Sequence, residues 1–197
     1  MSEIKKKNVL ITGGASGIGK LMCRMCLEQG AAKVIIWDLH LKAMEETAAE
    51  FAKLGKVYYY KVNVSDAKDI ANAYEKTKED AGYVDILINN AGIVKGNESF
   101  DKQKASDIQL TMDVNATAPM LVALEILPDM MMRNSGHICN IASAAGMLGV
   151  PRLSVYCASK WAVAGWTESL RIELKQARSK VKASCIAPYF INTGMFD

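Results

Sequence analysis

Short apolar stretches alternate with longer amphipathic segments along the whole chain. The apolar stretches predict six strands, at residues 8–12, 33–38, 56–62, 85–89, 136–141 and 181–187. Several contain three or four consecutive apolar residues, which is typical of strands covered on both faces. The segments between them predict helices at residues 18–29, 41–54, 67–81, 104–133 and 155–178. This alternation predicts an α/β fold, a doubly wound parallel sheet with right-handed crossovers and helices on both faces.

Length and composition fit one folded domain spanning residues 1–197. Half of the 197 residues are apolar, and no repeat or linker divides the chain. The net charge of +3 is too small to indicate a nucleic-acid partner. The first apolar run is too short for a signal sequence, and no later window is apolar over the roughly eighteen residues of a membrane span. We therefore expect no integral membrane segment and a cytoplasmic location.

The five cysteines show no spacing typical of a disulfide framework. Cys23 and Cys26 form a C-x-x-C pair within a predicted helix and among apolar neighbours, so we interpret both as buried apolar side chains. Cys139 and Cys185 lie in predicted strands and receive the same interpretation. The two histidines are isolated in the sequence, so no metal site is predicted.

A glycine-rich turn, T-G-G-A-S-G-I-G at residues 12–19, joins the first strand to the first helix. Gly13, Gly17 and Gly19 let the backbone approach a ligand closely, because no Cβ intervenes. The start of the following helix has unpaired N–H groups and a partial positive charge, which attract phosphate. The turn predicts a site for a dinucleotide diphosphate, and we include Ser16, a possible hydroxyl donor, and Ile18 in it.

Asp38 ends the second predicted strand, nineteen residues after Gly19. A carboxylate at this distance can accept both hydroxyls of an adenosine ribose, and it repels a 2′-phosphate. No Arg or Lys occurs at positions 14–16 or 39–41 to bind that phosphate. The pattern therefore predicts NAD as the cofactor, in preference to NADP. The alternative is that Asp38 only caps the following helix.

Ser143, Tyr156 and Lys160 form the candidate catalytic group. Reduction of a ketone needs a proton donor at the oxygen while hydride reaches the carbon. A free tyrosine, with a pKa near ~10, is a poor base at neutral pH, but a nearby cation lowers that pKa. Lys160 lies four residues after Tyr156 and therefore on the same helical face. Ser143, thirteen residues upstream of Tyr156, can hydrogen-bond the substrate oxygen.

A second Y-x-x-x-K pair, Tyr74 and Lys78, shows how weak this spacing is by itself. It has no serine thirteen residues upstream, and it lies in a charged stretch (E-K-T-K-E-D, 75–80) that is typical of a solvated helix face. Tyr156 instead follows a strand, Ser143 and a glycine-containing loop. In open α/β sheets the carboxyl end of such a strand lies beside the ligand crevice, which favours Tyr156.

These motifs, in this order and over essentially the whole chain, resemble those of the short-chain dehydrogenase/reductase family. Residues 12–19 look like its T-G-x-x-x-G-x-G turn, and N-N-A-G at 89–92 looks like the segment that stabilises its central sheet. The resemblance implies a Rossmann fold with a catalytic tetrad formed by Asn115, Ser143, Tyr156 and Lys160. In the family, the asparagine holds a water that links the lysine to solvent and completes a proton relay.

The resemblance also extends the predicted cofactor site. The further matching positions are Asn63, Val64, Asn90, Ala91, Gly92, Tyr156, Lys160, Pro188, Ile191 and Thr193. The first two correspond to residues beside the adenine ring, and the last three to the segment that meets the nicotinamide carboxamide. Tyr189 departs from the family, which usually has glycine at that position.

The segments at 188–196 and 90–94 look like those of the family branch that contains retinol dehydrogenases and microsomal 17β-hydroxysteroid dehydrogenases. Members of that branch often carry an N-terminal membrane-binding segment, which we do not expect here. The chain stops at Asp197, where the family's lid, seventh strand and last helix normally follow. Without them the sixth strand has an unpaired edge and the crevice is open, so we expect the natural protein to be longer.

Mostly apolar candidate pocket residues predict a lipophilic alcohol or ketone as substrate, such as a steroid, retinoid or long-chain alcohol. They are Ile93, Val94, Ala144, Met147, Leu148, Val150 and Tyr189. In many family members, the helices matching 104–133 and 155–178 form a four-helix interface, which implies a homodimer or homotetramer. Trp161, Val163 and Trp166 offer apolar surface for it, unless they pack against the sheet.

The leading hypothesis is an NAD-dependent alcohol dehydrogenase or ketone reductase. One alternative is a non-catalytic NAD-binding sensor or interaction protein on the same fold, although the four filled tetrad positions argue against it. Another is a dehydratase or epimerase, since such relatives share Y-x-x-x-K but usually differ in glycine spacing and chain length.

Overall fold

Six parallel strands form one sheet in the computed structural model, which describes residues 3–189 and 191. The strands are β1 (Asn8–Thr12), β2 (Lys33–Asp38), β3 (Val57–Lys61), β4 (Ile86–Asn89), β5 (His137–Ile141) and β6 (Lys182–Ile186). Their order is β3-β2-β1-β4-β5-β6, and every neighbouring pair is parallel. The predicted fold class is confirmed, and each strand end lies within one residue of its predicted position.

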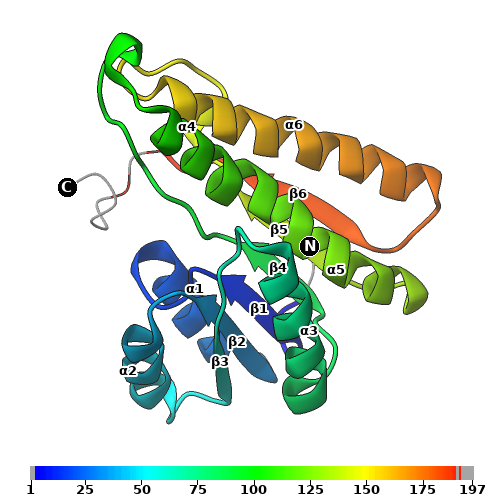
Figure 1. Ribbon diagram of the computed structural model, residues 1–197. Coiled ribbons are helices and arrows are strands. Elements are labelled where there is room, and N and C mark those ends of the chain that lie inside the picture. Colours follow the sequence, from blue (N-terminus) through cyan, green and yellow to red (C-terminus); the bar gives the residue numbers. More distant parts are fainter. Residues whose placement is uncertain (1–2, 190, 192–197) are drawn as a thin grey trace.

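Helices pack on both faces of the sheet (Figure 1). They are α1 (Gly17–Glu28), α2 (Leu41–Phe51), α3 (Ala67–Ala81), α4 (Ala105–Met112), α5 (Ala118–Met132) and α6 (Ser154–Gln176). Alternate residues of a strand point to opposite faces, so β1 contributes to two cores. Val9 packs with Cys23 and Met44 from α1 and α2, whereas Leu10 packs with Tyr74 and Ile126 from α3 and α5.

The burial of each cysteine follows from its place in this packing. Cys23 and Cys26 are buried in the core between α1 and the sheet, as predicted. Cys139 is half-buried, and Cys185 is exposed, so the prediction that Cys185 is buried is wrong. The reason is its strand, since within residues 3–189 and 191 β6 pairs with β5 alone and its outer side has no neighbouring strand.

The helix predicted at 104–133 is interrupted in the middle by a π-turn, η2 (Asp113–Thr117). There the Ala118 N–H donates to the carbonyl of Asp113, five residues back instead of four. Pro119, which has no N–H, follows at once and cannot donate to the carbonyl of Asn115 four residues before it. Such turns occur often at functional sites. The interruption places Asn115 where the regular helical ladder is broken.

By length and composition alone, the segment Ala105–Met132 is long and apolar enough to cross a membrane. However, 44% of its most apolar window is buried inside the protein, and Val122, Ile126 and Met130 pack against the sheet. A core helix passes the same test, so the segment is weak evidence for a membrane span.

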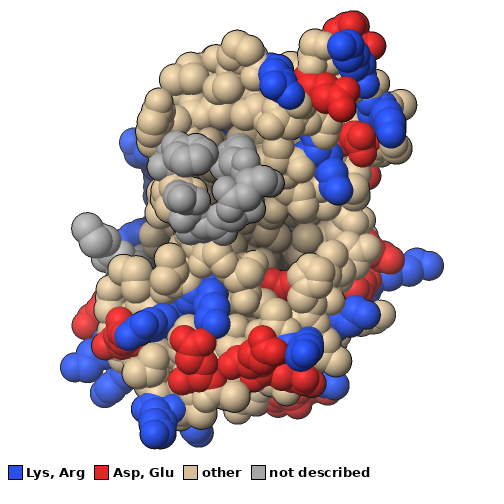
Figure 2. Space-filling model, turned by 90° about the vertical axis from the view of Figure 1, so that its left-hand side faces the viewer, with Lys and Arg blue, Asp and Glu red and all other residues tan. Residues whose placement is uncertain are grey.

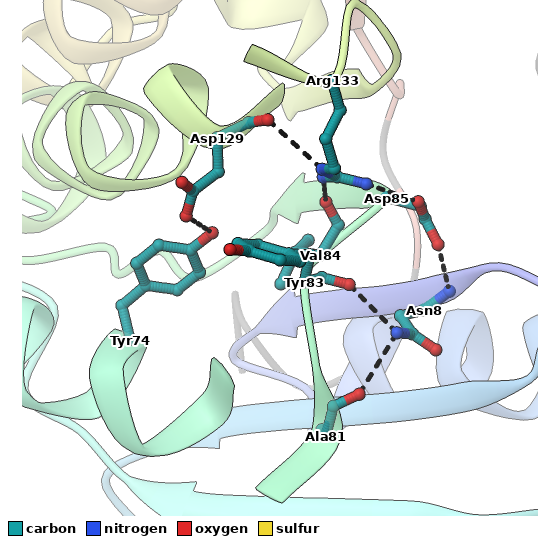
Figure 3. Close-up of polar contacts among 8 residues, drawn as sticks. All are labelled: Asn8, Tyr74, Ala81, Tyr83, Val84, Asp85, Asp129 and Arg133. Carbon is teal, nitrogen blue, oxygen red and sulfur yellow. Dashed lines mark hydrogen bonds and ion pairs between the residues drawn. The ribbon is translucent and has the colours of Figure 1, made fainter. Parts of the chain in front are cut away.

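A polar network ties the amino ends of β1 and β4 to the end of α5 (Figure 3). The carboxylate of Asp85 accepts from the Asn8 N–H at 3.0 Å and from Arg133 Nη1 at 2.9 Å. In the same region, the phenol of Tyr74 on α3 donates to Asp129 on α5 at 2.7 Å. Charge-assisted bonds between partly buried groups fix these elements together, at the edge of the sheet opposite the glycine turn.

A cavity of about 590 Å³ also opens toward the amino edge of the sheet, between the end of α6 and β6. Its walls include His137, Leu174, Lys175, Val181 and Lys182. None of the predicted site residues that the structure describes lines it. The cavity therefore lies away from the candidate site described next.

Candidate active site

The glycine turn after β1 is a tight cradle. Gly13 and Gly17 have positive φ angles of 65° and 51°, which side chains other than glycine rarely adopt. A Cβ on Gly19 would lie 2.0 Å from the carbonyl oxygen of Gly13, so the start of α1 can pack here only with glycine. Asn90 Nδ2 also donates to that carbonyl, at 3.1 Å.

Asn90 and Ala91 join this turn to the end of β4. Their N–H groups both donate to the hydroxyl of Thr12 at 3.0 Å, and Asn90 Nδ2 donates to the Thr12 carbonyl, also at 3.0 Å. The buried Thr12 side chain was not among the predicted site residues, although it begins the glycine motif. These bonds hold the ends of two central strands together beneath the cradle.

The start of α1 can receive a phosphate. The helix begins at Gly17, and Ser16 before it has an extended backbone, an exposed side chain and no capping bond from its hydroxyl. The N–H groups of Gly17, Ile18 and Gly19 are in the first turn and have no acceptor within the helix. Together with the positive end of the helix dipole, they fit a diphosphate held at the turn.

Asp38 lies at the end of β2 beside the cradle. Its carboxylate accepts from the N–H of Ala15 and from the N–H of His40, each at 3.1 Å. His40, not Asp38, is the N-cap residue of α2, which disfavours the view that Asp38 only caps that helix. A carboxylate has about four acceptor positions, so two remain for the hydroxyls of a ribose.

Two further predicted positions, Asn63 and Val64, follow β3. The Asn63 side chain is exposed and accepts from the N–H of Ser65 at 3.2 Å, while its backbone N–H donates to Asp69 at 2.6 Å. Val64 is buried in the core on the α3 side. Asn63 thus forms a local turn at the carboxyl edge of the sheet, before α3.

The segment after β6 approaches the loop after β5. The carbonyl of Pro188 accepts from the Ala144 N–H at 2.8 Å, next to Ser143. Ile191 is exposed. Thr193 lies outside the described residues.

Tyr156 lies in the first turn of α6 and is 5% exposed. It belongs to a small apolar cluster with Ala145 and Cys157, against which Val94 and Val150 pack. Burial raises the pKa of its phenol above the ordinary value, and a hydrogen bond with Ser143 lowers it only in part. Burial is the largest of these effects, so the pKa is raised overall. That the Lys160 ammonium makes the phenol more acidic stays a prediction from the sequence.

Lys160 is almost completely buried one turn later. Its Nζ donates to the carbonyl of Ile141 at 2.9 Å and lies 5.7 Å from the centre of the Tyr156 ring. Burial lowers its pKa from 10.5 to about 8. An amine with that pKa can both take up and release a proton near neutral pH.

Asn115 is held from both sides of the π-turn. Its Oδ1 accepts from the N–H of Ile93 and its Nδ2 donates to the carbonyl of Ile93, both at 2.8 Å. Nδ2 also donates to the hydroxyl of Ser159 on α6 at 3.2 Å. A Cβ on Gly92 would be 3.4 Å from Asn115 Oδ1 and 3.5 Å from Lys160 Nζ. Asn115 and Lys160 therefore face the same point beside Gly92.

The structure thus groups the predicted residues in two neighbouring sets. Gly13, Ser16–Gly19, Asp38 and Asn90 surround the glycine turn, and Asn115, Ser143, Tyr156 and Lys160 lie around the ends of β4 and β5. Gly92, three residues after the last residue of β4, connects the sets. Figure 2 shows the side toward which the strands point in Figure 1, with a hollow in its middle and charged side chains gathered below it.

Sequence reasoning missed two residues that support the catalytic set. Ser159 is fully buried between α6 and the π-turn. Gly146, in the short helical turn η3 (Ala144–Gly146), packs on α6, where an added Cβ would be 2.8 Å from the Lys160 carbonyl oxygen. In the sequence, only their positions point to them, since Ser159 directly precedes Lys160 and Gly146 follows three residues after Ser143. Within the described residues, no three His, Cys, Asp or Glu side chains are close enough to hold a metal ion.

Comparison with known proteins identifies this arrangement. The family model described as short chain dehydrogenase matches residues 7–197. The chain belongs to the short-chain dehydrogenase family. The resemblance seen in the sequence motifs is therefore confirmed, including the branch to which they pointed.

Similar proteins of this family include steroid and retinol enzymes. Estradiol 17-beta-dehydrogenase 11 of Mus musculus is 41% identical over 197 residues, which cover 96% of this chain and 65% of that protein. Epidermal retinol dehydrogenase 2 of Mus musculus is 38% identical, covering 96% of this chain and 62% of that protein. The chain thus spans less than two thirds of the length of these relatives.

Solved structures of the family share the fold closely. A short chain dehydrogenase/reductase from Burkholderia phymatum in complex with NAD superposes with a TM-score of 0.94 at 30% identity, covering 99% of this chain and 69% of that one. A metagenomic short-chain oxidoreductase in complex with NADP has a TM-score of 0.88 at 28% identity, covering 95% of this chain and 84% of that one. Such neighbours bind either dinucleotide, so the fold alone does not select between them.

Proposed function

We propose that the protein is an NAD-dependent oxidoreductase that interconverts an alcohol and a ketone or aldehyde. The observation that carries the proposal is the convergence of Ser143, Tyr156, Lys160 and Asn115 next to a glycine cradle at a helix N-terminus. A bound nicotinamide would supply or accept the hydride. The chain's own residues must then hold the substrate oxygen and move one proton to or from it.

Each member of the tetrad has one task in this proposal. The Ser143 hydroxyl accepts from the N–H of Ala145 at 3.2 Å and is hydrogen-bonded to Tyr156, which places it beside the phenol. When substrate binds, this hydroxyl turns its proton to the substrate oxygen. Tyr156, with its raised pKa, is a neutral phenol at pH 7 and can donate its proton to a carbonyl oxygen. Lys160 stabilises the phenolate that results, because its buried ammonium group is close and poorly solvated.

We propose NAD over NADP because Asp38 puts a negative charge beside the cradle. Its carboxylate is fixed by Ala15 and His40, so it cannot easily turn away from a 2′-phosphate. The KM for NADP should exceed that for NAD by at least about tenfold, since a charge repulsion of roughly 1.4 kcal/mol gives that factor. Equal KM values would contradict this preference.

We propose a lipophilic substrate. Two loops form one wall beside Tyr156, where Arg152 donates to the carbonyl of Asn97 at 2.9 Å. Val94 and Val150 from these loops pack against the Tyr156 cluster, and Met147 and Leu148 are exposed in the loop before α6, as expected for a pocket that receives an apolar molecule. The similar proteins named as estradiol and retinol dehydrogenases support this choice. Preference for polyols or sugars in a substrate panel would overturn it.

We also propose a homodimer or homotetramer formed through the outer faces of α5 and α6. Leu124, Trp161 and Ile172 expose apolar surface there. Val163 is buried and Trp166 packs against the core, because both lie on the inner side of α6, so neither supports an interface as the sequence suggested. The oligomeric state in solution, measured by light scattering, tests this proposal. A cytoplasmic location remains a prediction from the sequence.

The activity itself is tested by following NADH absorbance with a panel of alcohols and ketones. The wild type should turn over at least one lipophilic member, and Tyr156→Phe should lose about 10²–10⁴-fold in kcat because the proton donor is gone. Turnover that survives this change would exclude the role of Tyr156. Binding of NAD by the wild type without turnover of any substrate would favour the non-catalytic sensor instead.

A further inference from the structure

Ser159 contacts two elements of the candidate site through one hydroxyl group. It is fully buried in α6, between Tyr156 and Lys160. Its Oγ donates to the carbonyl of Tyr156 at 2.7 Å and accepts from Asn115 Nδ2 at 3.2 Å. Serines in helices often bond to a carbonyl three or four residues back, so the first contact is unexceptional. The second contact is not local, because Asn115 lies 44 residues away.

Hydrogen bonds to Ile93 and Ser159 fix the orientation of the Asn115 carboxamide. Ile93 accepts one proton of Nδ2 and donates its N–H to Oδ1. The other Nδ2 proton goes to Ser159, so both protons are used inside the protein. Removing the hydroxyl of Ser159 leaves that proton without an acceptor in a buried place, which favours a shift of the π-turn.

A continuous line of hydrogen bonds therefore joins the loop after β4 to the first turns of α6. It runs from Ile93 through Asn115 and Ser159 to the backbone of Tyr156. Gly92, next to Ile93, brings this line close to the Lys160 amine, since a Cβ added to Gly92 would lie 3.5 Å from Lys160 Nζ. The hydroxyl of Ser159 is the one link in this line between α6 and the π-turn.

We infer that Ser159 is a positioning residue that keeps the π-turn of Asn115 aligned with the Tyr156–Lys160 turn of α6. The inference rests on the proposed function, because it concerns proton transfer at that site. Ser159 acts through its neighbours and does not touch the substrate. Its loss should impair the proton-transfer step and leave the glycine cradle intact, since the cradle is held separately by Thr12 and Asn90.

The test compares Ser159→Ala with Ser159→Thr, and uses Ser169→Ala as the control. Ser169 lies on the same helix but is exposed, where its hydroxyl bonds only weakly to Glu173 at 3.4 Å. Ser159→Ala should lower kcat by about 10–100-fold, the effect expected when reacting groups are misplaced by about 1 Å. The KM for NAD should stay within about twofold, and the pH profile of kcat should shift, because the surroundings of Lys160 change. Ser159→Thr keeps the hydroxyl and should restore most of kcat, whereas Ser169→Ala should match the wild type.

Three results would contradict the inference. A wild-type kcat and pH profile in Ser159→Ala, with Tyr156→Phe inactive, overturns the positioning role alone. Equal loss of kcat in the alanine and threonine variants overturns it as well, because the retained hydroxyl should rescue. Full turnover in Tyr156→Phe removes the proposed function and this inference together. If Ser159→Ala does not fold, Ser159→Cys gives the same comparison at similar volume, since a thiol is a weak hydrogen-bonding group.

Discussion

Two helices carry the same Y-x-x-x-K spacing, and the structure places the two pairs in opposite chemical settings. On α6, burial lowers the pKa of Lys160, while Tyr156 is hydrogen-bonded to a neutral serine. On α3, the Lys78 amine pairs with Glu75 at 2.7 Å, and this bond raises its pKa. Tyr74 is also buried, but its phenol donates to the carboxylate of Asp129 (Figure 3).

The comparison shows that the groups bonded to the tyrosine and lysine decide whether a Y-x-x-x-K pair can transfer a proton. The four-residue spacing alone does not decide it. Both amines lie near the ring of their tyrosine, at 5.7 Å from the centre for Lys160 and 5.0 Å for Lys78. Burial and the bond to Asp129 both raise the pKa of Tyr74, so its proton is committed to a carboxylate within the protein. The α3 pair is thus part of the scaffold, and the α6 pair is available for proton transfer.

The largest predicted effect is a difference in kcat between variants of the two lysines. Lys160→Met should lower kcat by about 10²–10⁴-fold, because the charge that stabilises the phenolate is removed. Lys78→Met should leave kcat within about twofold. Steady-state assays of both variants with the best substrate decide this, and a comparable loss in Lys78→Met would break the distinction between the pairs.

The variant that loses turnover, Lys160→Met, should nevertheless gain stability, whereas Lys78→Met should hardly change it. Because burial lowers the pKa of Lys160 from 10.5 to about 8, keeping this amine charged below pH 8 lowers the free energy of unfolding. Lys160→Met should therefore raise the free energy of unfolding at pH 7 by about 2 kcal/mol, after allowance for the lost bond to Ile141. Lys78→Met should change it by less than about 1 kcal/mol.

This stability difference has a predictable pH dependence. Between pH 8 and 10.5 the unfolded wild type binds more protons at residue 160 than the folded form does, so its stability rises with pH. The methionine variant lacks that gain, and its advantage should shrink over this range. Urea unfolding at pH 7, 8.5 and 10 measures it, and an advantage that stays constant or grows would contradict the burial argument.

Gly146 offers a smaller test of how α6 is held. Gly146→Ala places a Cβ 2.8 Å from the Lys160 carbonyl, so the loop must move, and kcat should fall by about tenfold. Gly149 in the same loop is the matched control, since an added Cβ there meets no atom within 4 Å. Gly149→Ala should retain wild-type kcat. Equal kcat values for the two variants would show that the contact with α6 does not matter.

The smallest predicted effect concerns the scaffold pair. Tyr74→Phe removes the bond to Asp129, and the free energy of unfolding should fall by about 1 kcal/mol, because water can partly replace the lost donor at this partly exposed carboxylate. The kcat should not change. Thermal unfolding together with a turnover assay checks both, and a loss of kcat without a loss of stability would assign Tyr74 a role that its contacts do not support.

The sequence by itself determined the strand positions, the parallel sheet and the family. Apolar runs such as V-I-I-W at 34–37 indicate strands buried on both faces. The glycine motif at 12–19, between a strand and a helix, indicates a site for a diphosphate. Pairing of strands, and therefore the meeting of Thr12 with Asn90, follows from the topology of such sheets. These features are local, or repeat along the chain, so one sequence is enough to read them.

Only the tertiary structure decided the chemical state of the site. The pKa of Tyr156 and that of Lys160 depend on burial by residues far away in the chain, and burial is the largest cause of both shifts. The π-turn depends on Asn115 finding Ile93 and Ser159 in other elements. Burial and long-range hydrogen bonds are properties of the assembled core, so no spacing of residues along the chain could have predicted them.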